Sequence, residues 1–298
     1  MPRFLIFFVS IILMHHVAAL NLGPSQALKV KFQHGTKFTT GERTSSSRRS
    51  ILTGILGSSS IFLTSPPKPS SAKSSISSDE LRKIYDDGAS TYESLYSDSI
   101  VSRTLDFPTL RENLLSKASG EVLELGVGTG LNLPHYSKLT AESPLTSYTG
   151  LDISPKMMEQ AQEKFEKGVP NISPSLDDLY KQKKVNFQIG DVNDLSAVFE
   201  DKKFDTIIDT FGLCVFPDPL IALKEARKLL APNGNILLLE HQDSLIGKAL
   251  NPTRNIADVI STCRYDDDVL ALLRSAGFQN ISSKGFAGGF LLEVTASN

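Results

Sequence analysis

Apolar runs and amphipathic stretches alternate along this chain from about residue 78 to its end. Runs that are apolar throughout are typical of parallel strands covered on both faces. Apolar residues at helical spacing between the runs predict connecting helices. Strands are predicted in this way at residues 122–125, 146–152, 185–192 and 204–213, with a fifth that follows a turn at residues 232–234 and ends at His241.

Capping residues set the predicted helix boundaries in the first half of this region. Residues 79–96 are predicted to form a helix that Ser78 caps, and Ser154-Pro155 is a start signal for another. Residues 168–184 contain two prolines before a short polar helical piece. This segment is therefore predicted to be an inserted surface loop.

The last thirty residues predict a helix and two strands. The helix covers residues 266–276 and stops at Gly277, which suits a helix C-terminus. Strands are predicted at residues 278–282 and 289–295, joined through glycines. We expect an antiparallel ending on an otherwise parallel sheet.

Three glycines at alternate positions, Gly126, Gly128 and Gly130, follow Glu124-Leu125 directly. Glycine permits backbone angles closed to other residues and lets a ligand lie against bare main chain. The helix start that follows offers free N–H groups and a positive dipole end. A nicotinamide-dinucleotide fingerprint needs glycine at its sixth position, where this chain has Leu131. The glycines therefore indicate either a nucleotide-type ligand other than a nicotinamide dinucleotide, or a tight turn that binds no ligand.

Acidic residues end the second and third predicted strands. Asp152 lies roughly twenty residues past the glycine turn, where a carboxylate holds the hydroxyls of a nucleoside ribose. Asp191 lies just past the third run, and Thr210 lies within the fourth. Together with the glycines, these residues predict a nucleoside site at the strand ends.

The order of these features resembles the class I S-adenosylmethionine-dependent methyltransferases. The acidic-x-Gly-x-Gly-x-Gly run from Glu124 is similar to their motif I, and residues 227–234 resemble the segment before their fifth strand. The resemblance implies an α/β, Rossmann-like fold with a seven-stranded, mostly parallel sheet, an antiparallel C-terminal strand and helices on both faces. It places a methyltransferase domain at residues 78–298, with S-adenosylmethionine as cofactor.

A finer resemblance concerns the helix before motif I. Its pattern Tyr85-x-x-Gly-Ala-x-x-Tyr92-Glu93 looks like the segment in ubiquinone/menaquinone C-methyltransferases whose tyrosine helps to cover the cofactor. The alternative is an amphipathic lid helix whose aromatic residues are simply buried. The resemblance implies cofactor contacts at Tyr92, Glu124, Gly126, Gly128, Thr129, Gly130, Asp152, Ile153, Asp191, Val192 and Thr210, with Asp191 and Val192 beside the adenine.

The segment expected to face the methyl acceptor departs from the sequence pattern of the ubiquinone/menaquinone C-methyltransferases. In that group the Gly-Leu after the fourth strand is followed by Arg-Asn, but this chain has Cys214 and Val215. Gly-Leu-Cys here, and Leu-Leu-Glu-His closing the fifth strand, look more like the membrane-associated methyltransferase-like branch, some animal members of which methylate thiols. The expected acceptor is a small molecule of quinone, phenol or thiol type.

Methyl transfer makes modest demands on side chains, because a sulfonium methyl is already activated and a base is needed only for a protonated acceptor. His241 is one candidate base, with a structural histidine as the alternative. Cys214 is a second candidate, with a small buried hydrophobe as the alternative. Cys214 and Cys263 lack a Cys-x-x-Cys spacing, so the sequence indicates neither a metal site nor a redox pair and leaves a single bridge open.

Two rival functions remain open at this point. One is a methyltransferase-like scaffold or assembly factor that keeps the fold without turnover. The other is a nicotinamide oxidoreductase, which Leu131 disfavours. The sequence does not determine the acceptor.

Charge is distributed unevenly between the ends of the chain. Residues 1–78 contain nine Lys or Arg and one acid, Glu42, whereas the remainder contains 22 basic and 32 acidic residues. An acidic body lacks the positive surface that nucleic-acid binding requires, so we expect no nucleic-acid partner. We expect a monomer. The basic, acid-poor start predicts a targeting leader over residues 1–77.

The leader has three predicted parts. An apolar run behind Arg3 and a small-residue site at residues 17–19 are typical of a signal peptide over about residues 1–19. A Ser/Thr-rich, basic stretch follows, and then Arg48-Arg49 precedes a second apolar run that ends at Leu63, within a segment to about residue 72. That run is a second export signal, a peripheral membrane anchor or a linker. The combination predicts a plastid reached by the secretory route, with the thylakoid as an open further step and another organelle membrane or the secretory pathway as alternatives.

Overall fold

The computed structural model describes residues 76–97, 100–138, 144–167, 172–244, 263–264 and 267–298. The chain divides into Met1–Lys68 and Pro69–Asn298, and every described residue lies in the second unit. The predicted leader, up to residue 75, lies outside the described residues. Within the described part of the chain, no helix is long and apolar enough to span a membrane.

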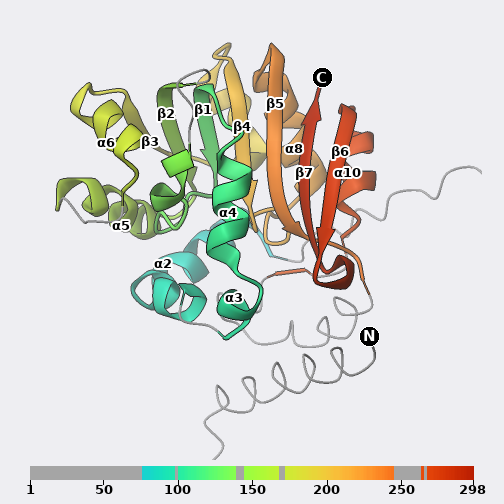
Figure 1. The fold of residues 1–298 in the computed structure, drawn as a ribbon, viewed down its shortest axis with the longest axis horizontal. Helices are drawn as coiled ribbons and strands as arrows, with labels where there is room; N and C mark the ends of the chain where they lie inside the picture. Colours follow the sequence, from blue (N-terminus) through green and yellow to red (C-terminus); the bar gives the residue numbers. More distant parts are fainter. Residues whose placement is uncertain (1–75, 98–99, 139–143, 168–171, 245–262, 265–266) are drawn as a thin grey trace, which may run out of the picture. The chain divides into compact units, whose positions relative to one another are not determined.

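A seven-stranded sheet forms the centre of the second unit (Figure 1). Its strand order is β3-β2-β1-β4-β5-β7-β6, and every neighbouring pair from β3 to β5 is parallel. Of the seven strands, β7 runs antiparallel to its neighbours. This confirms the predicted sheet and its antiparallel C-terminal strand. The strands are β1 (Gly120–Leu125), β2 (Leu145–Asp152), β3 (Val185–Ile189), β4 (Phe204–Thr210), β5 (Leu230–His241), β6 (Gln279–Phe286) and β7 (Leu291–Ser297).

Helices cover both faces of the sheet, and α2 lies at the carboxyl ends of the parallel strands (Figure 1). The cores assign α7, α8 and α10 to one face and α4 and α6 to the other. The α-helices are α2 (Ser78–Ser97), α3 (Ile100–Thr104), α4 (Phe107–Leu115), α5 (Pro155–Glu166), α6 (Pro174–Lys181), α7 (Leu195–Phe199), α8 (Pro219–Leu229) and α10 (Val269–Ala276). Short 3₁₀ turns lie at η1 (Leu133–Lys138), η2 (Val192–Asp194) and η4 (Ala287–Gly289).

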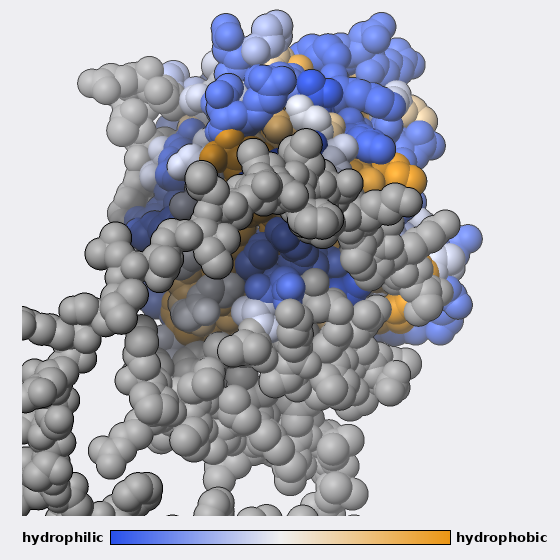
Figure 2. All heavy atoms as spheres, turned by 90° about the vertical axis from the view of Figure 1, so that its right-hand side faces the viewer, coloured by the Kyte–Doolittle hydropathy of each residue, from blue (hydrophilic) through white to orange (hydrophobic). Residues whose placement is uncertain are grey.

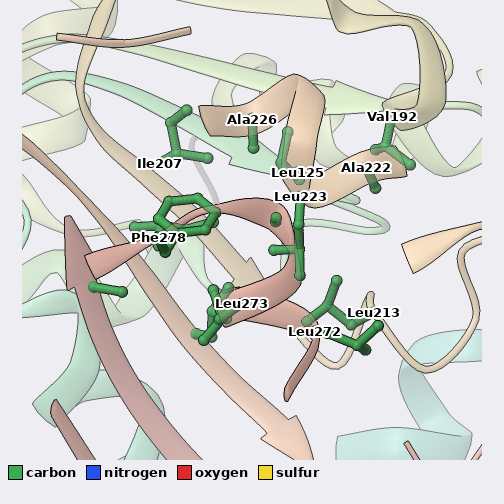
Figure 3. Close-up of a cluster of buried hydrophobic side chains, with 14 of the residues drawn as sticks. Leu125, Val192, Ile207, Leu213, Ala222, Leu223, Ala226, Leu272, Leu273 and Phe278 are labelled. Carbon is green, nitrogen blue, oxygen red and sulfur yellow. The ribbon is translucent and has the colours of Figure 1, made fainter. Parts of the chain in front are cut away.

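Two hydrophobic cores, one on each face, hold these layers together. Successive strand residues point to opposite faces, so Ile207 joins one core and Ile208 the other. Figure 3 shows the first core, where Leu223 of α8 and Leu273 of α10 pack near Ile207 and Phe278. Because both faces are buried, the strands must be apolar throughout, which is the pattern that predicted them.

Several strand boundaries differ from the predictions: β1 begins two residues earlier, β6 ends at Phe286 and β7 spans Leu291–Ser297. Three further differences concern β3, β4 and β5. The turn at residues 232–234 lies inside β5, because β5 begins at Leu230, opposite Phe204, and then bulges before Asn235 pairs with Thr206. The third strand ends at Ile189 rather than residue 192, since Asp191 caps the next turn. The fourth ends at Thr210 rather than residue 213.

Helix boundaries differ for reasons of capping and packing. Ser77, not Ser78, caps α2, exchanging hydrogen bonds with Glu80. Asp268 caps α10, which therefore begins at Val269 rather than at residue 266. The predicted surface loop at residues 168–184 contains α6, which buries Leu176 in the second core. Its residues 168–171 lie outside the described part.

The edge strand β6 is polar and mostly exposed, with the sequence QNISSKGF. Figure 2, viewed from the side of β6 and α10, shows a largely hydrophilic face with separate hydrophobic patches. Polar and charged residues on an exposed edge discourage pairing with another chain.

Candidate active site

The glycine turn after β1 adopts backbone angles that favour glycine. Gly126, Gly128 and Gly130 have φ of 60°, 57° and 79°. A Cβ on Gly130 would lie 2.6 Å from Leu133, whereas one on Gly128 would have no neighbour closer than 3.9 Å. Gly130 therefore serves packing, and Gly128 leaves an open approach to bare main chain.

Asp152 lies at the carboxyl end of β2, against this turn. Its Oδ2 accepts a hydrogen bond from the Gly128 N–H (2.7 Å), and its Oδ1 accepts one from the Ser154 N–H (2.8 Å). Burial raises the pKa of Asp152 to about 6, although these N–H groups favour the charged form. The carboxylate retains further lone pairs for a ligand.

Asp191 lies beyond the end of β3 and faces α2. Its Oδ1 accepts from the Asn193 N–H (2.8 Å), and its Oδ2 accepts from the Ser78 hydroxyl (2.5 Å). Ser78, which the sequence suggested as a cap, thus ties the lid helix to the predicted adenine side of the site.

One cavity brings most of the predicted residues together. Its enclosed volume is about 60 Å³, well below the roughly 300–1,000 Å³ of small-molecule sites. Of the residues predicted to contact cofactor, the cavity is lined by Tyr92, Gly126, Gly128, Asp152, Ile153, Asp191, Val192 and Thr210. Seven further residues that were not among the predicted contacts also line the cavity: Leu81, Tyr85, Phe211, Gly212, Val215, Phe216 and Pro217.

Three predicted contact residues lie outside this lining. Glu124 is buried below it, where its carboxylate accepts hydrogen bonds from Asn132, Tyr136 and Tyr148. Thr129 is fully buried, and Gly130 packs on Leu133. Glu124 therefore acts on the site through its neighbours, by fixing Asn132 behind the glycine turn.

Arg111 of α4, which the sequence analysis missed, is a buried cation near the site. Its Nη1 donates to Asn132 Oδ1 (2.5 Å) and to the Thr210 hydroxyl (2.7 Å). Its guanidinium also lies 5.2 Å from the centre of the Phe211 ring. Arg111 is 15 residues before Gly126, and no local pattern marks it. It places positive charge behind the cavity wall formed by Thr210 and Phe211.

Helix α2 closes the cavity and is held by polar contacts along its length. Asp86 Oδ1 accepts from the Ser154 hydroxyl (2.6 Å) and the Lys156 N–H (3.2 Å), and Glu93 pairs with Lys164 at 3.1 Å. The Tyr92 ring stacks on Tyr96 at 4.8 Å. Burial raises the pKa of the Tyr92 hydroxyl well above its usual value, so it stays neutral.

A buried pair of carboxyls lies at the ends of β4 and β5. Glu240 Oε1 accepts from the Gly212 N–H (3.0 Å), and Asp209 Oδ2 accepts from the Leu213 N–H (3.0 Å). Burial raises the pKa of Asp209 to about 7, and burial together with the Asp209 charge raises the pKa of Glu240 further. Two adjacent buried carboxyls are most stable when they share a proton. The pair fixes the backbone that lines the cavity at Gly212.

The two candidate catalytic residues do not line the cavity. His241 is buried between the rings of Phe211 and Phe290, each 5.0 Å away, and burial lowers its pKa to about 3. Cys214 is joined to Cys263 by a disulfide. Spacing alone indicated no redox pair, but the fold brings together two sulfur atoms that are 49 residues apart in sequence.

Residues 123–238 match the family model described as a methyltransferase domain. The chain is 30% identical over 216 residues to the Saccharomyces cerevisiae protein named methyltransferase OMS1, mitochondrial. The aligned region covers 67% of this chain and 42% of the yeast protein. This chain therefore contains a domain of the class I S-adenosylmethionine-dependent methyltransferases, over residues 123–238. It thus spans less than half the length of the yeast methyltransferase.

Two further comparisons cover more of the length of the other protein. The demethylmenaquinone methyltransferase of Staphylococcus carnosus is 26% identical over 245 residues, 73% of this chain and 92% of the bacterial protein. The solved DhpI–SAH complex is 21% identical, with a TM-score of 0.50, over 74% of this chain and 95% of that one. At that identity, the structural likeness supports the fold alone.

The described residues of this methyltransferase fit the family's cofactor. Gly128 offers an open backbone approach, and Asp152 offers a carboxylate with free lone pairs at the strand end where a ribose is held. Asp191 and Val192 continue the same lining. The volume of about 60 Å³ is small for a molecule of that size, so we expect α2 to shift outward when the cofactor binds.

Proposed function

We propose that this protein transfers a methyl group from S-adenosylmethionine to a small acceptor of quinone, phenol or thiol type. The observation that carries the proposal is a cavity whose lining combines a polar and an apolar part. The glycine turn, Asp152 and Asp191 make up the polar part, and Val215, Phe216 and Pro217 belong to the apolar part.

The polar side accounts for cofactor binding. Asp152 would accept hydrogen bonds from the ribose hydroxyls while its backbone donors keep it ionised. Val192 would contact the adenine beside Asp191, and the bare backbone at Gly128 would admit the methionine part. The cofactor supplies an activated methyl group on a sulfonium. The protein aligns the acceptor with that methyl group and excludes water through α2.

The apolar side constrains the acceptor. Among the described lining residues there is no Lys, Arg or His, and the acids Asp152 and Asp191 disfavour an anionic group. A cavity of this kind suits an apolar acceptor that enters as a neutral molecule and loses its proton readily on reaction, such as a thiol with a pKa of about 8.5. The absence of Arg-Asn at positions 214 and 215 makes thiols and phenols better candidates than quinones.

A radiolabelled-methyl screen tests the proposal. Full-length protein is incubated with methyl-labelled S-adenosylmethionine and separate panels of thiols, phenols and reduced quinones, and the Gly128→Val variant serves as the negative control. We expect transfer to at least one apolar thiol or phenol by the wild type and none by the variant. Calorimetric binding of S-adenosylmethionine without transfer to any panel would contradict the proposal and favour a scaffold.

The proposed location is a plastid reached through the secretory route, supported by the arrangement of charge and apolar runs in residues 1–78. A fusion of residues 1–78 to a fluorescent protein should enter the plastid in cells with secretory-route plastids. A fusion of residues 21–78 should remain outside, because it lacks the apolar run after Arg3. Replacement of Arg48 and Arg49 by Lys should block only a later step into the thylakoid lumen. A mitochondrial signal, as the name of the yeast relative suggests for that protein, would overturn this scheme.

A further inference from the structure

The Cys214–Cys263 disulfide ties the loop between β4 and α8 to the segment that precedes α10. This β4–α8 loop, residues 211–218, contributes Phe211, Gly212, Val215, Phe216 and Pro217 to the cavity lining. The bridge therefore joins one wall of the cavity to a distant part of the chain. Both sulfur-bearing residues are buried, at 2% and 1% exposure.

Arg264, next to the bridge, holds the same loop by its backbone. Its guanidinium donates to the carbonyls of Leu213 (2.8 Å) and Phe216 (3.0 Å), and its own N–H donates to the Cys214 carbonyl (2.8 Å). Asp267 neutralises the guanidinium with a contact of 3.0 Å. The disulfide is therefore the covalent attachment of a loop that Arg264, Asp209 and Glu240 also hold by hydrogen bonds.

A histidine touches one sulfur of the bridge. His241 Nδ1 lies 3.2 Å from Cys263 Sγ. Since burial lowers the pKa of His241 to about 3, the imidazole is neutral at physiological pH. Such a weakly basic imidazole does not deprotonate a thiol, but in the tautomer that carries the proton on Nδ1 it can donate a hydrogen bond to the Cys263 sulfur. This contact stabilises Cys263 as the thiolate that leaves when the bridge opens.

We propose that Cys214 and Cys263 form a reversible redox site that controls the ligand affinity of the methyltransferase cavity. With the bridge closed, the β4–α8 loop is fixed in its cavity-lining position. With the bridge open, the hydrogen bonds of Arg264 and of the Asp209 and Glu240 carboxyls still hold the loop, but the covalent restraint at Cys214 is lost and the wall loses part of its preorganisation.

The exchange is a dithiol–disulfide reaction. One thiolate of a dithiol reductant attacks Cys214 Sγ, the Cys214–Cys263 bond breaks, and Cys263 leaves as a thiolate that takes up a proton. The second thiolate of the reductant then attacks the mixed disulfide and releases Cys214, which is protonated in turn. Two electrons pass from the reductant, which leaves as its own disulfide. Re-oxidation is the reverse: Cys263 loses its proton to solvent, and its thiolate attacks the mixed disulfide at Cys214 while the His241 N–H stabilises it.

Affinity for S-adenosylhomocysteine tests this site without any knowledge of the acceptor. Calorimetry on the full-length protein, air-oxidised and then treated with dithiothreitol, should show weaker binding after reduction. Because Arg264 still holds the loop, we expect the lower end of typical coupling between sites, about fivefold. Mass spectrometry after N-ethylmaleimide treatment should count no alkylated cysteine before reduction and two after it. Equal affinity in the two states would overturn the proposal.

Two variants separate the bridge from other effects of reductant. The Cys214→Ser, Cys263→Ser double variant should bind with the affinity of the reduced wild type and should not respond to dithiothreitol. If this variant fails to fold, the comparison within the wild type still decides the outcome. The His241→Leu variant, which has no hydrogen-bond donor at this position, should open the bridge with dithiothreitol about 2- to 10-fold more slowly, the effect of losing one hydrogen bond to the leaving thiolate.

A metal centre is the competing chemistry for this cluster. The ligand atoms of Cys214, His241 and Cys263 lie within 4.8 Å of one another. If the isolated protein retains one equivalent of Zn²⁺ and its cysteines are unbridged, the redox proposal is overturned. Absence of a response to reductant is distinguishable from failure of the methyl-transfer screen, since the calorimetry uses S-adenosylhomocysteine and needs no acceptor.

Discussion

Position 128 combines two requirements that no side chain satisfies. Its φ of 57° lies in the left-handed region, and the space above it opens toward the Tyr92 ring, which lies 3.9 Å from the place that a Cβ would occupy. The first requirement concerns stability and the second concerns ligand access. Gly288 has a similar φ of 68° but has no atom within 4 Å of its Cβ position, so it isolates the first requirement.

We expect Gly128→Val to abolish S-adenosylmethionine binding while the fold remains. The branched side chain occupies the approach to the backbone, whereas the strain of a positive φ costs only about 1–3 kcal/mol. Calorimetry measures the affinity and circular dichroism the fold. Gly288→Val should lose similar stability and keep normal affinity. Unchanged affinity in a folded Gly128→Val protein would refute the role of the turn.

Asp152→Ala should weaken S-adenosylmethionine binding by about 1.5–3 kcal/mol, the value of hydrogen bonds to a charged group. The ribose hydroxyls lose their acceptor, while Asp191 and Val192 remain in the lining. Calorimetry at pH 8, above the pKa of about 6, measures the ionised wild type. Asp178→Ala, an exposed change on α6, should have no effect. If both variants bind equally well, Asp152 does not hold the ribose.

At the scale of elements, we expect α2 to be the part of the site that moves when a ligand enters. It is held to the core by side-chain contacts at Ser78, Asp86 and Glu93 and buries only Leu81 and Ala89 fully among its described residues. A helix that is attached mainly by polar contacts and buries few apolar side chains opens at a lower free-energy cost than a core helix. The enclosed volume of about 60 Å³ shows the closed position.

Ser78→Ala should speed the association of S-adenosylmethionine. The variant loses the hydroxyl contact to Asp191, so α2 opens at a lower free-energy cost. A net hydrogen bond contributes about 0.5–1.5 kcal/mol, which predicts an increase in rate of about 2- to 10-fold if opening limits entry. Stopped-flow tyrosine fluorescence measures the rate. Ser90→Ala, an exposed change on the same helix, is the control, and equal rates for both variants would show that α2 does not gate entry.

For the whole molecule, the buried carboxyls connect folding stability to pH. The pKa of Asp209 is about 7 in the folded protein and about 3.9 in an unfolded chain. The folded state therefore keeps a proton that the unfolded state loses, and the contribution of Asp209 to stability falls as pH rises from about 4 to about 7. His241, with a pKa of about 3, contributes in the opposite direction between about pH 3 and 6.5.

Asp209→Asn should remove the first of these contributions. The unfolding free energy of the variant relative to wild type should increase between pH 5 and pH 8, at up to about 1.4 kcal/mol per pH unit. Urea denaturation at several pH values, followed by circular dichroism, gives this difference. His241 titrates in both proteins, so its contribution cancels. Parallel curves would show that Asp209 is ionised in the folded protein at neutral pH.

The sequence by itself determined the parallel strands, the glycine turn and the acids at the strand ends. These features are local: a two-face-buried strand must be apolar throughout, and a ligand at the end of β2 or β3 needs an acid at a fixed place in the chain. Asp152 and Asp191 therefore line the cavity as their positions predicted. Boundaries failed where packing overrode local signals, as in β5, where pairing with Phe204 extends the strand through the expected turn.

Only the tertiary structure decided the contacts between residues far apart in sequence. Arg111 reaches Thr210 across 99 residues, Ser78 reaches Asp191 across 113, and Cys214 meets Cys263 across 49. No periodicity or spacing encodes such pairs, because they depend on which loops the sheet order brings to one edge. The same holds for the pKa values of Asp209 and His241, since burial is a property of the packed molecule and not of the neighbouring sequence.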